Sequence, residues 1–184
     1  MRKVGLALLG LGTIGSGVMK VLEENGKMIR DHEGIEIEVK KILVRDTSRK
    51  RSIEVNRDLL TDNPEDVFKN DEIDIIAEFM GGERPALDYI RTALKQGKSV
   101  VTANKEVIAK HLDELELEAQ KSGAGLYFEA SVAGGIPIIK TLRRSLQANH
   151  VLEIMGIING TTNYILTRMS EQGRSFDDVL AEAQ

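Results

Sequence analysis

Near its start the chain reads Val4-Gly-Leu-Ala-Leu-Leu-Gly-Leu-Gly-Thr-Ile-Gly-Ser-Gly17, an apolar run that leads through spaced glycines into a helical pattern. We interpret it as a strand, a tight turn and a helix start, rather than as a plain glycine-rich loop. Gly10 would make the turn, Gly12 would let the backbone approach a pyrophosphate, and Gly15 would let helix and strand pack closely. The N–H groups and dipole of a helix start favour negative charge. The pattern predicts a dinucleotide-binding turn made by Gly10, Leu11, Gly12, Thr13, Ile14 and Gly15.

Strands and helices alternate through the following part of the chain. Strands are predicted at 35–44, 72–80, 99–102 and 125–129. Helices are predicted from Gly15 to near Arg30, from Asn63 to Phe68, from Pro85 to Gly97 and from Asn104 to Gly123, and the rest of 47–72 reads as connective. This alternation is typical of right-handed βαβ units. The predicted fold class is therefore α/β, a doubly wound parallel sheet of the Rossmann type.

Composition excludes several classes of protein. The 184 residues are 41% hydrophobic, enough to bury a sizeable core, and their net charge of −4 includes no block of like charges. With 4% aromatic residues and no tryptophan, neither double-stranded nor single-stranded nucleic acid is an expected partner. The run after Met1-Arg2-Lys3 is interrupted by glycines and has no cleavage site, so we read no secretory signal, and no apolar stretch is long enough to span a membrane. The absence of cysteine fits a reducing cytoplasm.

The end of the predicted strand 35–44 bears on the choice of cofactor. In this type of fold an acidic residue here binds the ribose 2′-hydroxyl of NAD, whereas an arginine accommodates the 2′-phosphate of NADP. The sequence has Arg45 followed by Asp46, which favours NADP and leaves NAD open. Lys50 and Arg51 would each be able to add a second cation, but we interpret them as solvated loop charges.

Ligands of such sheets bind outside the carboxyl ends of the strands, so the residues at those ends are candidate site residues. Gly81 follows one strand and is a candidate contact of the cofactor. Lys105 follows the buried strand 99–102, where its ammonium group would reach a carbonyl oxygen near the nicotinamide. The plainer interpretation is a solvent-facing lysine at a helix start, although the helix dipole disfavours a cation there. We therefore interpret Lys105 as a catalytic and cofactor-binding residue.

Four motifs together carry a resemblance to a known family. They are Gly-Leu-Gly-Thr-Ile-Gly at 10–15, Thr-Ala-Asn-Lys at 102–105, Glu-Ala-Ser-Val-Ala-Gly-Gly-Ile-Pro at 129–137 and Asn-Gly-Thr-Thr-Asn-Tyr-Ile-Leu at 159–166. In their order and spacing they resemble the homoserine dehydrogenases. The resemblance implies an oxidoreductase of threonine and methionine biosynthesis. Its reaction would be the reversible NAD(P)H-dependent reduction of L-aspartate 4-semialdehyde to L-homoserine.

The resemblance also implies roles for particular residues. Lys105 resembles the family's lysine beside nicotinamide and substrate, and Gly160-Thr161 resembles a turn that contacts the amino acid. The stretch 129–137 resembles a loop that binds a monovalent cation such as sodium through backbone carbonyl groups, which are hard oxygen ligands. Those carbonyls would belong to Glu129, Val132, Gly134 and Ile136. Read from spacing alone, this loop is a strand-to-helix turn, and the side chains of Glu129, His111 and His150 are interpreted as structural.

The pattern changes near the end of the chain. Residues 151–158 read as a strand, Thr161 or Thr162 would cap a helix, and Ser175 begins a last helix that reaches Gln184 without a stop signal. We predict a dinucleotide-binding domain at 1–147 and the incomplete start of an α+β substrate and dimerisation domain at 148–184. The family's substrate carboxylates and principal acid–base lysine have no counterparts here. We therefore expect this chain to bind cofactor but to turn over substrate poorly, and the resemblance suggests a homodimer of the full-length protein.

Two other functions stay open at this point. One is another amino-acid dehydrogenase of similar architecture. The other is a module that binds a dinucleotide without catalysis, as a redox sensor would. A sensor needs the glycine turn but not Lys105 or Gly160-Thr161, so the presence of these residues favours the enzyme.

Overall fold

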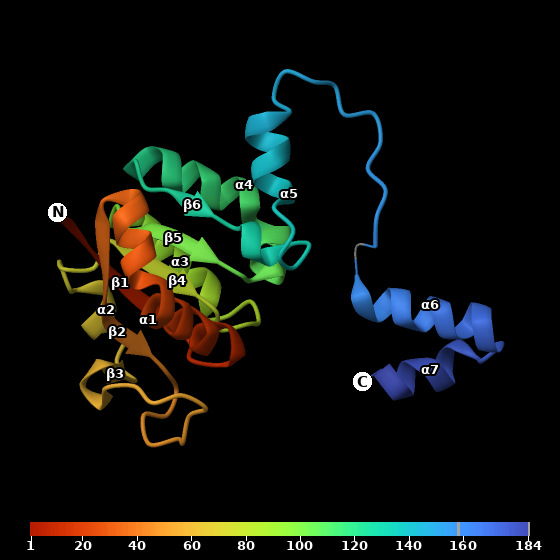
Figure 1. Cartoon of the computed structure of the whole chain (residues 1–184), viewed down its shortest axis with the longest axis horizontal. Helices are drawn as coiled ribbons and strands as arrows, with labels where there is room; N and C mark the ends of the chain where they lie inside the picture. The colour runs from red at the N-terminus through yellow and green to blue at the C-terminus, as the bar shows by residue number, and fades with distance from the viewer. Residues whose placement is uncertain (158, 184) are drawn as a thin grey trace. The chain divides into compact units, whose positions relative to one another are not determined.

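The computed structural model describes residues 1–157 and 159–183. The chain forms two compact units, Met1–Val132 and Ala133–Gln184, which we call the first and the second unit (Figure 1). The first unit contains the glycine turn and all the predicted strands up to residue 129. The domain boundary after residue 147 stays a prediction.

A six-stranded parallel sheet forms the centre of the first unit, in the order β3-β2-β1-β4-β5-β6. Its strands are β1 (Arg2–Leu9), β2 (Ile35–Leu43), β3 (Leu60–Thr61), β4 (Ile75–Glu78), β5 (Ser99–Thr102) and β6 (Leu126–Tyr127). Strand order reverses between β1 and β4, which is the point where ligands bind in such sheets. The Rossmann-type α/β fold predicted from the sequence is confirmed.

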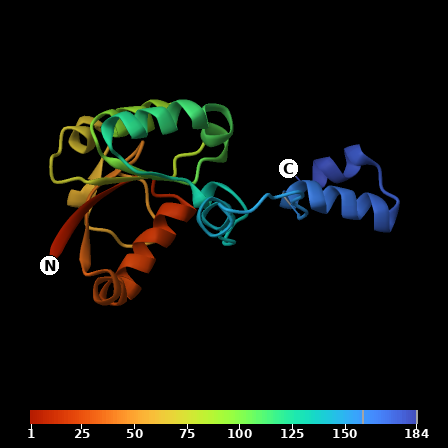
Figure 2. The ribbon, with the colours of Figure 1, turned by 90° about the horizontal axis from the view of Figure 1, so that it is seen from above.

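Helices cover both faces of this sheet. They are α1 (Thr13–Glu33), α2 (Glu65–Phe68), α3 (Ala86–Lys95) and α4 (Lys105–Ser122), with short 3₁₀ turns η1 (Arg57–Leu59) and η2 (Glu129–Ser131). Figure 2 shows α1 on one face and α3 and α4 on the other. The predicted stop of α4 at Gly123 is confirmed, with a left-handed backbone there. Helix α1 runs past Arg30, where its pattern fades, and ends at Gly34, which also has a left-handed backbone.

The core lies between the sheet and these helices. Leu8, Leu9 and Ile76 of the central strands are fully buried, as are Leu87 and Ile90 on the inner face of α3. Burying one such side chain contributes about 1.5–3 kcal/mol. Because β1 is apolar on both of its faces, it takes the central position in the sheet and carries the glycine turn at its carboxyl end.

Part of the region interpreted as connective is a strand. Residues 60 and 61 form β3, which pairs with Ile42 and Leu43 of β2. A two-residue strand has no hydrophobic period of its own. Only the backbone groups of the neighbouring strand define it.

The second unit contains α5 (Ile138–Lys140), a π-helical turn η3 (Thr141–Ser145), α6 (Gly160–Gln172) and α7 (Phe176–Ala183). The predicted strand 151–158 is wrong for residues 151–157, which form no strand, and residue 158 lies outside the described residues. A strand needs a hydrogen-bonding neighbour, and the described residues of this unit contain no second strand. The cap of α6 is Asn159, whose side chain accepts from Thr162 N at 2.9 Å, rather than Thr161 or Thr162.

In the stretches 1–157 and 159–183 no helix has both the length and the apolar character that crossing a membrane requires.

Candidate functional site

A cleft of about 730 Å³ opens at the carboxyl ends of β1, β2 and β4, where the strand order reverses. Its size is ordinary for a site that holds a small molecule or cofactor. It is lined by Gly10, Leu11, Gly12, Thr13, Ser16, Leu43, Val44, Arg45, Asp46, Arg49, Lys50, Arg51, Ser52, Phe79 and Met80. The structure thus brings the predicted glycine turn and Arg45 together in one cavity.

The glycines of the turn have distinct geometries. Gly10 has a φ of +104°, and a Cβ there would lie 3.0 Å from the Phe79 carbonyl oxygen. A Cβ on Gly15 would lie 2.3 Å from the Gly10 carbonyl oxygen, so strand and helix approach each other too closely for any side chain. A Cβ on Gly12 would meet no atom within 4 Å. Gly12 therefore leaves open space in the cleft, as a cradle for a phosphate group requires.

Cations form one wall of the cleft. Arg45 and the later loop residues Arg49, Lys50 and Arg51 all line it. Arg51 donates from Nη2 to the carbonyl oxygen of Asp46, while its Nε is buried and has no hydrogen-bond partner among the described residues. A buried N–H without an acceptor is costly, which makes this wall suited to an anionic ligand.

Asp46 stabilises the loop that carries these cations. Its Oδ1 accepts from the Ser48 hydroxyl at 2.6 Å and from Ser48 N at 2.8 Å. These two hydrogen bonds hold the pKa of the Asp46 carboxyl below its usual value. One carboxylate oxygen therefore serves the loop, whereas the sequence had placed Asp46 only as an alternative ligand of a ribose hydroxyl.

The interpretation of Lys50 and Arg51 as solvated loop charges missed their place on the cleft wall. The available signal was the repeated cation pattern after β2, from Arg45 to Arg51. Sequence reasoning could not use it because the turn that folds this loop back over the cleft depends on Asp46 and Ser48.

Lys105 lies at the same edge of the sheet but does not line this cleft. It is the first residue of α4 and is exposed, and its ammonium group makes no hydrogen bond or ion pair with the residues that the structure describes. Asn104 caps the helix, as predicted, by accepting from Val107 N at 3.2 Å. Gly81, with a φ of +72°, is also exposed, and Ile14 and Gly15 belong to the turn without lining the cleft.

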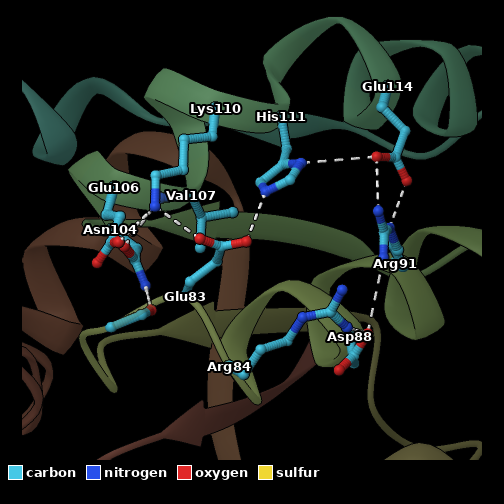
Figure 3. A network of polar contacts seen from close by, with 11 residues as sticks. Glu83, Arg84, Asp88, Arg91, Asn104, Glu106, Val107, Lys110, His111 and Glu114 are labelled. Carbon is cyan, nitrogen blue, oxygen red and sulfur yellow. Dashed lines mark hydrogen bonds and ion pairs between the residues drawn. The ribbon is translucent and has the colours of Figure 1, made fainter.

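A polar network ties the loop after Gly82 to α4 (Figure 3). Glu83 accepts from Lys110 Nζ at 2.7 Å and contacts His111 Nε2 at 3.0 Å. These contacts lower the pKa of Glu83 to about 2, and the carboxylates of Glu106 and Glu83 raise the pKa of Lys110. His111 also faces Glu114, at 3.8 Å. The place of His111 within this network agrees with its interpretation as a structural residue.

The residues of the predicted cation loop fall in both units. In the first unit Glu129 begins η2, and its carbonyl oxygen accepts from Val132 N at 3.3 Å. In the second unit Gly134 has a φ of +59°, and Ile136 N donates to the carbonyl oxygen of Ala133 at 3.1 Å. Gly160 and Thr161 form the first turn of α6, after its cap Asn159.

Sequence reasoning missed one functional candidate, Glu78. It is the last residue of β4, is fully buried and has hydrogen bonds to both of its carboxylate oxygens. The signal was a charged residue within the apolar run Ile-Ile-Ala-Glu-Phe-Met at 75–80.

Comparison with family models gives two matches. Residues 10–129 match the model described as "Homoserine dehydrogenase, NAD binding domain", and residues 137–184 match the model described as "Homoserine dehydrogenase". The first of these covers the sheet beyond Leu9, with the glycine turn, Arg45 and Lys105.

Individual relatives agree with these models. The chain is 41% identical over 184 residues to the homoserine dehydrogenase of Bacillus subtilis and 46% identical over 186 residues to that of Helicobacter pylori. In both comparisons 100% of this chain corresponds to 42% of the relative, so the chain spans less than half of the length of these curated relatives.

Two solved structures show the same fold. The crystal structure of a homoserine dehydrogenase from Thiobacillus denitrificans has a TM-score of 0.87 and 44% identity, covering 100% of this chain and 42% of that one. A hyperthermophilic archaeal homoserine dehydrogenase in complex with NADPH has a TM-score of 0.82 and 29% identity, covering 99% of this chain and 60% of that one.

Proposed function

The chain belongs to the homoserine dehydrogenase family and carries its NAD-binding domain, and on this premise we propose that it serves the reversible reduction of L-aspartate 4-semialdehyde to L-homoserine. The observation that carries the proposal is the cleft at the strand-order reversal, which joins a glycine turn to a cationic wall. NADPH, when bound, supplies the hydride for this reduction. One neighbouring structure is described as a complex with NADPH.

The chain's own residues would bind the cofactor in two places. The N–H groups at the start of α1 bind the pyrophosphate in the space that Gly12 leaves open. Arg45, on the cationic wall, binds the 2′-phosphate, which makes NADP the preferred cofactor over NAD.

Lys105 would act on the substrate carbonyl. Reduction of an aldehyde places negative charge on its oxygen, and an ammonium group within hydrogen-bond distance stabilises that charge. Support comes from its position at the carboxyl edge of the sheet and from its lack of an ion pair among the described residues, which leaves its charge available. The dipole of α4 disfavours a cation at this position, so the fold of the helix alone does not explain a lysine there.

The remaining roles rest on the family relationship. Gly160 and Thr161 would contact the amino acid, and the backbone carbonyls of Glu129, Val132, Gly134 and Ile136 would bind a monovalent cation such as sodium, because carbonyl oxygen is a hard ligand. We further propose that the full-length protein is a homodimer and acts in the cytoplasm on the small molecules aspartate semialdehyde and homoserine.

The test uses a chimera, because the chain spans only part of its relatives. Its 184 residues are joined to the part of a curated relative that follows the matched segment. NADPH formation from L-homoserine is measured for this chimera, for its Lys105→Met variant and for a Lys27→Met control on the exposed side of α1. We expect turnover in the chimera and the control, and a loss of about 10²- to 10³-fold in kcat for Lys105→Met.

A chimera that binds NADPH but does not oxidise homoserine would contradict the proposed substrate. It would favour the alternative of a dinucleotide-binding module without this activity. Full activity of the Lys105→Met variant would contradict only the role given to the lysine.

A further inference from the structure

Glu78 is a buried carboxylate at the end of β4 that the proposed mechanism does not use. It is 0% exposed and forms no ion pair with the residues that the structure describes. Its Oε1 accepts from Met80 N at 2.7 Å, and its Oε2 accepts from the Thr102 hydroxyl at 2.6 Å. Burying a carboxyl group completely is costly even when both oxygens are hydrogen-bonded, so packing alone does not account for a glutamate here.

The contacts continue from Thr102 to the start of α4. The Thr102 hydroxyl oxygen accepts from Asn104 N at 3.0 Å. Asn104 Nδ2 then donates to the carbonyl oxygen of Gly82 at 2.7 Å, while its Oδ1 caps the helix at Val107 N (Figure 3). The hydrogen bonds therefore connect the turn after β4 to the turn after β5 through Glu78, Thr102 and Asn104.

The sheet itself does not need this connection. Glu78 and Thr102 are already paired in register by the backbone of β4 and β5. The side-chain hydrogen bonds instead reach residues beyond the strands, namely Met80, Gly82 and Asn104. Met80 lines the cleft, and Lys105 begins α4 directly after Asn104.

A carboxyl group suits this position because its two oxygens accept from donors on different elements, Met80 N after β4 and the Thr102 hydroxyl at the end of β5. A glutamine of the same shape has only one acceptor oxygen. Either its amide nitrogen would face Met80 N, or it would donate to the Thr102 hydroxyl and leave the hydroxyl hydrogen without an acceptor in a buried place. The unpaired group would then shift the turn that carries it.

We infer that Glu78 is a positioning residue, which acts through Thr102 and Asn104 to fix the turn at Met80–Gly82 and the start of α4 for the nicotinamide half of the cofactor. This inference rests on the proposed function, because it assumes that a dinucleotide extends from the glycine turn to these two turns. The adenosine half contacts the Gly10–Thr13 turn and Arg45, which Glu78 does not touch.

The experiment compares two ligands. NADPH reaches both halves of the site, whereas adenosine 2′,5′-bisphosphate represents the adenosine half alone. Their affinities are measured by fluorescence or calorimetric titration for the wild-type chain and for Glu78→Gln, Thr102→Val and Thr102→Ser. Thr92→Val is the matched control, because it also removes a hydrogen bond donated by a threonine hydroxyl. That bond runs from Thr92 to the carbonyl oxygen of Asp88 on α3. Amide hydrogen exchange at Met80, Asn104 and Val107, whose N–H groups donate to Glu78, Thr102 and Asn104, is followed in the same proteins, relative to Val100 in β5.

We expect Glu78→Gln and Thr102→Val to weaken NADPH binding by about 5- to 50-fold, the cost of one buried unpaired group, with adenosine 2′,5′-bisphosphate unchanged within about twofold. Thr102→Ser keeps the hydroxyl and should restore NADPH affinity, and Thr92→Val should leave it unchanged. Faster exchange at Asn104 and Val107, with Val100 unchanged, would accompany the loss of affinity.

Equal losses for both ligands, or a fall in thermal stability with unchanged NADPH affinity, would overturn the inference and leave Glu78 a structural residue. A wild-type chain that binds neither ligand would instead contradict the proposed function. In that case the exchange data alone decide whether Glu78 fixes the two turns, and unchanged exchange in Glu78→Gln would refute it.

Discussion

The carbonyl oxygen of Gly10 lies where the side chain of residue 15 would begin, 2.3 Å from the position of a Cβ on Gly15. The end of β1 and the first turn of α1 therefore touch backbone to backbone. This contact holds the start of α1 over the cleft, where Gly12 leaves open space. The fold thus places the unpaired N–H groups of the helix at the site where a phosphate would bind.

Substitution of Gly12 should separate binding from folding. A Gly12→Val side chain meets no protein atom at its Cβ but fills the space that the pyrophosphate needs, so NADPH binding should be lost while the fold survives. Gly17→Val is the matched control, because its Cβ also meets no atom within 4 Å and Gly17 does not line the cleft. Titration with NADPH checks this, and undiminished affinity of the Gly12→Val chain would refute the assignment of the turn.

Removal of Arg45 should narrow the preference for NADPH over NADH. A charge-assisted hydrogen bond to the 2′-phosphate contributes about 1.5–3 kcal/mol, so the ratio of the two dissociation constants should fall by about 10- to 150-fold in Arg45→Ala. Arg57→Ala, which removes an arginine that does not line the cleft, should leave the ratio unchanged. If wild type bound both cofactors equally, Arg45 would have no role in the choice.

Arg51 should contribute to the same preference. Its buried Nε lacks a partner among the described residues, and an anion on the cleft wall would supply one. The Arg51→Lys variant keeps the charge but loses the guanidinium geometry. We expect it to weaken the binding of NADPH more than the binding of NADH in the same titrations. Equal weakening of both cofactors would place Arg51 in the support of the loop instead, through its bond to Asp46.

The hydrogen bonds and ion pairs of Glu83 should make the free energy of unfolding depend on pH. The contacts with Lys110 and His111 lower the pKa of Glu83 from 4.5 to about 2, so the folded state binds a proton less readily than the unfolded state. The stabilisation is therefore present above the unfolded pKa and is lost as pH falls from about 4.5 towards 2. Urea unfolding should show Glu83→Gln less stable than wild type at about pH 5.5, with the difference shrinking at about pH 2.5.

Glu54→Gln provides the control for that experiment. Glu54 is exposed and forms no ion pair with the described residues. Its substitution should leave the free energy of unfolding unchanged at both pH values. If the free energies of unfolding of wild type and Glu83→Gln differed by the same amount at both pH values, the ion pairs of Glu83 would be too exposed to water to affect stability.

Helix α6 should depend on Asn159 rather than on the threonines that follow it. Asn159→Ala removes the acceptor of Thr162 N and should destabilise the helix start by about 1 kcal/mol. Amide exchange at residues 160–165 would then accelerate by about fivefold, whereas Thr161→Ala should leave it nearly unchanged. If Thr161→Ala accelerated the exchange and Asn159→Ala did not, Thr161 would be the cap instead.

The alternation of apolar runs and glycines along residues 1–129 was enough to predict a parallel sheet, the glycine turn, the helix stop at Gly123 and the cap at Asn104. These features are local or periodic. Each depends on groups a few residues apart, so a linear sequence displays them directly. Arg45 was identifiable for the same reason, because it follows β2 immediately.

Contacts across the chain decided the rest. β3 exists because Ile42 and Leu43 offer backbone partners to residues 60 and 61, while 151–157 lack such a partner and form no strand. Arg51 joins the cleft wall through a loop closed by Asp46 and Ser48. Glu78 meets Thr102 only because β4 and β5, 24 residues apart in sequence at that point, lie side by side in the sheet. Hydrogen bonds between distant residues leave no period in a sequence, so only the folded sheet identifies them.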